Sequence, residues 1–331
     1  MTKRENAMAI YRGEIPEYYG DLMDSIKLIP DPLLVRNMIP KDGKEHQDIW
    51  GTSFVFLPDA PGAHPHVTAE NAVIKDIEHW EEQLQIPDYS GFDFTQAREE
   101  AEKIDRSEYL VGFMLSGGLF ERSHHLMGMT EALINYLEYP DEMKGLLRVI
   151  ADKKMEYIRM VARECKPDII FYHDDWGAKK SLFLPPAVWR DIIKPLQKEI
   201  ADTIHECGMI YMHHSDCFCQ PLAPDMLDIG IDIWQGVIPQ NDIVEIQKVT
   251  EGKLAMVGGV DGPMLDVEGI SEEAIRQEVR RAIDTYCPAG RFYPTIANSR
   301  CFRQWNNQIY RDELEKYGHE FAQRQRAEAG L

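Results

Sequence analysis

Short apolar runs that end in polar residues recur from residue 108 onward, and no other feature constrains the fold as strongly. Each run has the length of a β-strand, and helical stretches with one apolar face separate the runs. Strands that alternate with helices predict parallel strands joined by helices. In such folds the chemistry lies where the carboxyl ends of the strands meet. The runs are 108–115, 168–177, 208–217, 232–237, 253–262 and 291–298.

The number of strand–helix units favours a closed barrel over a dinucleotide-binding sheet. No Gly-x-Gly-x-x-Gly fingerprint follows a predicted strand. A length of 331 residues is normal for a barrel with additions. Residues 1–50 are acidic and irregular and predict an N-terminal extension, with helices at 3–12 and 18–26. Because no linker or low-complexity segment divides the chain, we predict a single domain over 1–331.

The charge balance argues against several classes of partner. Lys and Arg number 36 against 56 for Asp and Glu, which gives a formal net charge of −20. Nucleic acids and anionic membrane surfaces require a basic face, so we expect no nucleic-acid and no membrane partner. The first residues are polar, no run of about 18 apolar residues occurs, and the six cysteines lack the spacing of a secreted disulfide scaffold. These features predict a cytoplasmic protein.

Groups that bind metals are concentrated where the third strand of the series ends. An imidazole, a carboxylate and two thiols lie within six residues there, from His214, Asp216, Cys217 and Cys219. Catalytic zinc commonly keeps three protein ligands and one open position, and thiolates favour zinc over magnesium or calcium. The predicted ligands are His214, one of the two thiols, and Cys301 after the last strand. Asp216 is either a fourth ligand or a hydrogen-bonding neighbour of one; a loop without metal is the alternative.

The preceding strand also ends in polar residues, His173, Asp174 and Asp175. Consecutive strand residues point to opposite faces, so at most one of the two aspartates faces the barrel interior. That residue would orient a ligand histidine, bind substrate or move a proton, and helix capping is the alternative. We therefore treat these three residues as candidate catalytic residues.

Further side chains near the strand ends are candidates for binding a substrate. Trp176, Tyr293 and Asn298 lie at or beside the ends of two predicted strands. Aromatic rings suit a pocket with apolar walls, and core packing is the alternative for both aromatic residues.

The order and spacing of several motifs resemble the uroporphyrinogen decarboxylase superfamily. The similar pieces are DIWG (48–51), GGLFERSHHLMG (117–128), YPDEM (139–143), DDWG (174–177), HSDC (214–217), DIGID (228–232), VGGVDG (257–262) and the late Cys301. This resemblance implies a (β/α)8 TIM barrel, here with an N-terminal extension. The superfamily has two main branches. Residues 1–45 lack the arginine-bearing motif with which true decarboxylases hold their substrate.

The second branch comprises zinc-dependent, corrinoid-linked methyltransferases, which typically show His-x-Cys-Gly at this strand end. His214 matches the histidine, whereas Asp216 stands where the cysteine is expected and Cys217 takes the place of the glycine. Cys219 is then the candidate replacement. The metal ligands implied by the resemblance are His214, Cys219 and Cys301, with Asp216.

The resemblance implies an enzyme, a zinc-dependent methyltransferase. With an aspartate in place of a thiolate, the metal is expected to be more electrophilic, which suits cleavage of an ether. We therefore expect an O-demethylase that transfers a methyl group from a methoxylated aromatic compound to the cobalt(I) corrinoid, a cobalamin-type cofactor, of a partner protein. The alternatives are a methylcorrinoid:thiol methyltransferase, a metal-free uroporphyrinogen-type decarboxylase and a non-catalytic barrel that binds a tetrapyrrole or stores metal.

Overall fold

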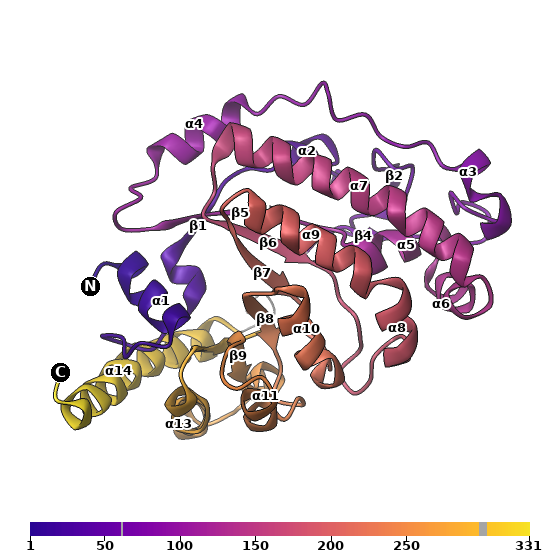
Figure 1. The fold of residues 1–331 in the computed structure, drawn as a ribbon. Helices are drawn as coiled ribbons and strands as arrows, with labels where there is room; N and C mark the ends of the chain where they lie inside the picture. The colour runs from indigo at the N-terminus through magenta and orange to yellow at the C-terminus, as the bar shows by residue number, and fades with distance from the viewer. Residues whose placement is uncertain (61, 298–302) are drawn as a thin grey trace.

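A computed structural model describes residues 1–60, 62–297 and 303–331 (Figure 1). Seven parallel strands form one sheet in the order β1-β5-β6-β7-β8-β9-β10. They are β1 Ile26–Leu28, β5 Leu110–Leu115, β6 Ile169–His173, β7 Ile210–His214, β8 Ile233–Val237, β9 Ala255–Val260 and β10 Phe292–Ile296. The predicted α/β architecture with parallel strands is confirmed. The described residues supply seven of the eight strands that a complete barrel requires.

Helices connect these strands and pack on the sheet (Figure 1). None of the described helices is both long and apolar enough to cross a membrane. The helices are α1 Lys3–Arg12, α2 Pro32–Arg36, α3 Trp80–Gln83, α4 Thr95–Lys103, α5 Leu119–Met127, α6 Met129–Glu138, α7 Pro140–Cys165, α8 Pro186–Ile192, α9 Lys194–Glu206, α10 Ala223–Ile229, α11 Ile243–Val249, α12 Gly262–Leu265, α13 Glu272–Tyr286 and α14 Gln304–Ala329. Short 3-10 turns are η1 Leu22–Ser25, η2 Ile77–His79, η3 Gln220–Leu222 and η4 Cys287–Ala289.

The helical periodicity of the sequence translates directly into burial. In α7 the apolar positions Met143, Leu146, Leu147 and Ile150 are fully buried, because residues three and four apart share one helix face. The helical spacing of apolar residues over 186–207 predicts a single helix, but the chain forms two helices there, α8 and α9. Pro195 lies at their junction and has no N–H to continue the hydrogen-bond ladder.

The N-terminal segment differs from the expected pair of helices. After α1, residues 22–25 form one 3-10 turn, and the chain then enters β1, the first strand of the sheet. Pairing with β5 overrides the local helical pattern, since Ile26 lies opposite Leu110. The same segment contacts the other edge of the sheet, because the Tyr293 hydroxyl of β10 donates to the carbonyl oxygen of Ala7 at 2.7 Å.

A small antiparallel sheet follows β1 and lies beside α5 (Figure 1). It consists of β2 Glu45–Gln47, β3 Ser53–Val55 and β4 His64–Pro65. The alternating residues 48–57 predict one longer strand, of which only β3 forms. A buried ion pair ties it to α5, with Arg122 Nη1 2.6 Å from Asp48 Oδ2.

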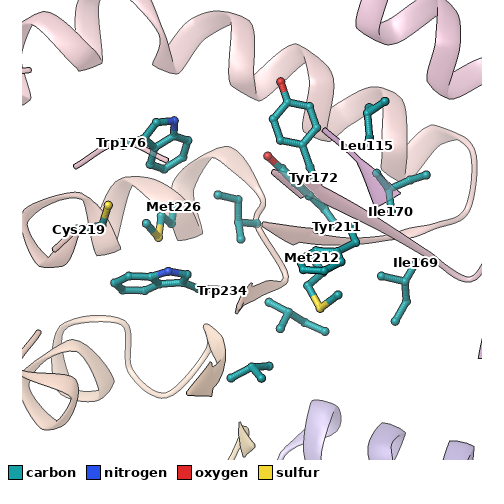
Figure 2. Close-up of a cluster of buried hydrophobic side chains, with 14 of the residues drawn as sticks. Leu115, Ile169, Ile170, Tyr172, Trp176, Tyr211, Met212, Cys219, Met226 and Trp234 are labelled. Atoms are coloured by element: carbon teal, nitrogen blue, oxygen red, sulfur yellow. The ribbon is translucent and has the colours of Figure 1, made fainter. Parts of the chain in front are cut away.

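The apolar core extends from α1 to α14 and includes the side chains of the central strands. Figure 2 shows its side chains from β5, β6, β7 and β8 together with the loops that follow them. These strands are buried on both faces, which explains their nearly continuous apolar runs.

Candidate metal centre

Three metal-binding side chains converge at the ends of β6 and β7. His173 and His214 are the last residues of these strands and lie opposite each other in the parallel register. Their rings stack with centroids 4.3 Å apart. Asp175 lies two residues beyond His173, and its carboxylate joins the two imidazoles in a group whose ligand atoms all lie within 4.8 Å of one another. Two imidazoles and a carboxylate form a donor set that suits zinc and other first-row transition metals.

Each member of this triad is oriented by a hydrogen bond. His173 Nδ1 donates to Glu121 Oε1 at 2.9 Å, and His214 Nδ1 contacts Gln235 Oε1. The backbone N–H of Asp216 donates to Asp175 Oδ1 at 3.1 Å. Metal-bound histidines characteristically donate their other ring nitrogen to a carboxylate or carbonyl oxygen. The contacts of Glu121 and Gln235 therefore match what a metal site requires.

The charges of the triad are shifted by burial and by one another. Burial and, after it, the negative charge of Glu121 raise the pKa of Asp175 to about 7. Burial alone would lower the pKa of His173, but the hydrogen bond and charge of Glu121 raise it to about 9. The site thus favours positive charge next to its carboxylates, and a divalent cation supplies such charge.

Asp174 is not part of the triad, but it binds the segment at the start of α5 that contacts His173. Its side chain is fully buried and accepts hydrogen bonds from the backbone N–H groups of Phe120 and Glu121, at 3.2 and 2.9 Å. Trp176 Nε1 donates to the same carboxylate at 2.9 Å. Asp174 therefore holds the first turn of α5, where Glu121 contacts His173. A side chain at position 118 would come within 2.2 Å of the Asp174 Cβ, which explains Gly118.

The two thiols of the loop after β7 do not join the triad. Cys219 is fully buried, and its Sγ lies 3.3 Å from that of Cys217. Figure 2 shows Cys219 in the apolar cluster, near Met226. Burial raises the pKa of the Cys219 thiol well above its ordinary value, which opposes the thiolate that a metal requires. Among the described residues, His214 forms a possible metal group with His173 and Asp175. Cys219 is not part of this group.

Asn241 fixes this loop and explains why the thiols face the core. Its Oδ1 accepts from the backbone N–H of Cys219 at 2.9 Å, and its Nδ2 donates to the carbonyl oxygen of Cys217 at 3.0 Å. The next residue, Asp242, caps α11 by accepting from the N–H of Glu245.

Of the remaining predicted site residues, one lines the cavity, two lie in the core and two fall outside the described residues. Asp216 lines the same cavity as the triad. Trp176 and Tyr293 are buried in the core, where the ring of Trp176 packs at a tilt against that of His213 with centroids 4.1 Å apart. Cys301 and Asn298 lie outside the described residues.

The triad opens into a cavity of about 870 Å³. The strand ends form one wall, and the N-terminal segment with the small sheet forms another. Its apolar lining comes from Met23, Leu28, Leu33, Leu34, Met38, Ile39, Phe54, Phe56, Met114 and Phe171, and its acidic lining from Asp31, Asp48, Glu121, Asp175 and Asp216. A cavity of this size with mostly apolar walls and a few polar groups is typical of a small-molecule site.

Sequence reasoning missed Glu121 and Gln235. Gln235 carried a signal, since it is the one polar side chain within the apolar strand run 232–237 after Asp232, and such a residue needs a buried partner. Glu121 stands in the motif GGLFER, whose conformation depends on Asp174 of another strand, so its position could be obtained only from the fold.

Comparisons with known proteins give one family and a structural likeness. The profile of a family described as uroporphyrinogen decarboxylase matches residues 56–301. No curated protein sequence matches the chain. A methyltransferase from Methanosarcina mazei shares 15% identity and a TM-score of 0.70, and the match covers 96% of this chain and 99% of that chain. A B12-independent methionine synthase from Shewanella sp. W3-18-1 shares 13% identity with a TM-score of 0.41, over 69% of this chain and 66% of that chain. The likeness to the first structure shows a shared fold.

Proposed function

The chain belongs to the uroporphyrinogen decarboxylase family, and from this premise we propose that it is a metal-dependent methyltransferase acting on aromatic methyl ethers. The family predicted from the sequence is confirmed by the profile match. The proposed reaction moves the methyl group of a methoxylated aromatic compound to the cobalt(I) corrinoid of a separate partner protein and leaves a phenol.

One observation carries this proposal. His173, Asp175 and His214 form a possible metal group with ligand atoms within 4.8 Å, and all three line the cavity of about 870 Å³. The proposed metal is zinc, with Cys301 as a candidate further ligand. Asp175 and His173, which the sequence analysis placed among the catalytic residues, replace Cys219 in the ligand set, and Asp216 is assigned as a hydrogen-bonding neighbour through its N–H.

The ligand set suits cleavage of an ether. An aryl methyl ether resists attack because its phenolate is a poor leaving group. Bound zinc would supply Lewis-acid chemistry at the ether oxygen. Two neutral imidazoles and one carboxylate donate less charge to a metal than thiolates do, so the described donors leave it electrophilic. Glu121 and Gln235 fix the two imidazoles.

The cavity supports the choice of an aromatic substrate. Phe54, Phe56 and Phe171 and several aliphatic side chains line it, and these surfaces favour a flat apolar ring. Met38 lines the cavity and is 77% exposed, so the opening to the outside lies near this residue. The corrinoid of the partner protein would approach through this opening.

Methyl transfer itself tests the proposal. Zinc-loaded protein, a reduced corrinoid protein and a panel of methoxyarenes are mixed, and formation of methylcobalt is followed by its absorbance while the phenol is measured by chromatography. We expect methylcobalt and phenol in equal amounts with at least one methoxyarene. If no methoxyarene reacts while methylcobalamin methylates a thiol, the protein acts in the opposite direction. Release of CO₂ from a porphyrinogen would instead indicate a decarboxylase.

A further inference from the structure

Asp31 contributes a carboxylate to the cavity on the wall formed by β1. Its side chain is 5% exposed and lines the same cavity as the triad. Oδ1 accepts hydrogen bonds from the backbone N–H of Leu33 at 2.8 Å and from the Tyr157 hydroxyl. Oδ2 is buried and has no hydrogen-bond partner among the described residues.

A structural role explains only one of the two carboxylate oxygens of Asp31. Oδ1 caps the start of α2 by accepting a hydrogen bond from the N–H of Leu33. An asparagine at this position would cap the helix equally well without a buried charge. A buried carboxylate oxygen without a partner is unfavourable in the folded protein. Lys154 does not supply the missing donor, because its Nζ donates to the carbonyl oxygen of Ser116 at 2.7 Å. No ion pair between Lys154 and Asp31 occurs among the described residues. Oδ2 is thus an acceptor for which the described chain supplies no donor.

Three of the other carboxylates of the cavity have assigned partners. Asp48 pairs with Arg122 at 2.6 Å, Glu121 accepts from His173 at 2.9 Å, and Asp175 belongs to the metal group. The unpaired oxygen of Asp31 disfavours a substrate that places a carboxylate of its own next to it. A neutral aromatic ring with a hydrogen-bond donor is better matched to the cavity.

The position of Asp31 specifies where that donor lies on the ring. β1 and β6 are separated by β5 in the sheet, so their ends lie two strand spacings apart, about 10 Å. The metal group stands at the end of β6, and Asp31 follows β1. A methoxy group at the metal therefore places the opposite side of the ring toward Asp31.

We propose that Asp31 is a specificity-determining residue that accepts a hydrogen bond from a ring hydroxyl located para to the reacting methoxy group. This inference rests on the proposed function, because it takes the methoxy group to lie at the metal. The favoured substrates are para-methoxyphenols, and arenes with a carboxylate or a second methoxy group at that position are disfavoured.

The Asp31→Asn variant tests this assignment by exchanging an acceptor for a donor. Its Oδ1 is still needed by Leu33 and Tyr157, so the amide NH₂ takes the place of Oδ2. Binding of para-methoxyphenol, para-dimethoxybenzene and para-methoxybenzoate is measured by calorimetry at pH 8 on zinc-loaded protein without corrinoid protein. The wild type should bind the phenol at least about tenfold more tightly than the other two. Asp31→Asn should lose this preference or reverse it.

Two further variants control for folding and for surface charge. Tyr157→Phe removes a donor to Oδ1 but keeps the carboxylate, so it should retain the preference for the phenol. Asp24→Asn changes an exposed aspartate outside the cavity and should leave all three affinities unchanged.

The outcomes separate this inference from the proposed reaction. An unchanged preference for the phenol in Asp31→Asn overturns the role of Asp31 even if methyl transfer occurs. A lost or reversed preference supports it even if no methyl reaches cobalt, in which case the proposed reaction fails alone. If none of the three arenes binds the wild type, the role of Asp31 is also overturned.

Discussion

The Asp174 carboxylate accepts a hydrogen bond from the backbone N–H of Glu121 at 2.9 Å. Glu121 in turn contacts the imidazole of His173 at 2.9 Å. A carboxylate that lines no part of the cavity thereby determines the position of a proposed metal ligand. The connection runs from β6 to the start of α5 and back to the end of β6.

This relationship predicts that residues outside the ligand set control metal affinity. Glu121→Gln and Asp174→Asn should each weaken zinc binding by about 10- to 100-fold, because His173 loses its orienting partner or the helix turn that carries it. Competition with a chromogenic chelator measures the affinity. Asp152→Asn, an exposed change on α7, is the control. Wild-type affinity in both test variants would show that Glu121 does not orient a ligand.

The buried ion pair between Arg122 and Asp48 is expected to be needed for stability. The side chains are 8% and 3% exposed, so Arg122→Met leaves an uncompensated carboxylate in the interior. We expect a loss of about 3–5 kcal/mol in the free energy of unfolding, measured by denaturant titration. Faster proteolysis within 40–65 should accompany it, since this pair ties the small sheet to α5. Lys198→Met, which breaks an exposed pair, should have little effect, and equal stability of both variants would refute the prediction.

Asp31 should make the folded protein less stable as the pH rises. Burial raises the pKa of its carboxyl from 3.8 to about 6 in the folded state. Between these values the folded state binds more protons than the unfolded state, so stability falls with rising pH, and the loss is complete above about pH 6. Asp31→Asn removes this loss. The variant should be more stable than the wild type by about 1–3 kcal/mol at pH 7.5, with the advantage absent below pH 3.8.

Denaturant titrations of both proteins between pH 4 and pH 8 measure this difference. A constant difference across the range would mean that Asp31 does not titrate as its burial requires. A stabilised variant that discriminates less between arenes would also indicate that the carboxylate is kept for binding.

Periodicity sufficed for most elements because burial follows helix and strand repeats. Apolar residues at helical spacing predict a helix over 140–165, which is the extent of α7, and β5 to β10 all lie within the predicted runs. β1 was missed because Ile26–Leu28 forms a strand only through pairing with β5. Local sequence contains no information on such a long-range contact.

The sequence analysis placed a metal site at the end of the strand that is β7, whereas the structure groups possible ligands from the ends of both β6 and β7. His173 and His214 meet because of the parallel register between β6 and β7. Cys219 is close to His214 in sequence, yet the loop held by Asn241 turns its thiol into the core. Sequence proximity therefore favoured Cys219 as the neighbour of His214, whereas the register brings His173 and Asp175 next to it.

His173, Asp175 and His214 are the residues proposed to hold the metal. The most direct test is the zinc content of purified protein, measured by mass spectrometry for the wild type, Asp175→Ala and Cys219→Ala, with circular dichroism to confirm folding. We predict about one zinc per chain in the wild type and in Cys219→Ala, and loss of zinc in folded Asp175→Ala. Full zinc content in Asp175→Ala together with loss of zinc in Cys219→Ala would contradict the proposed site.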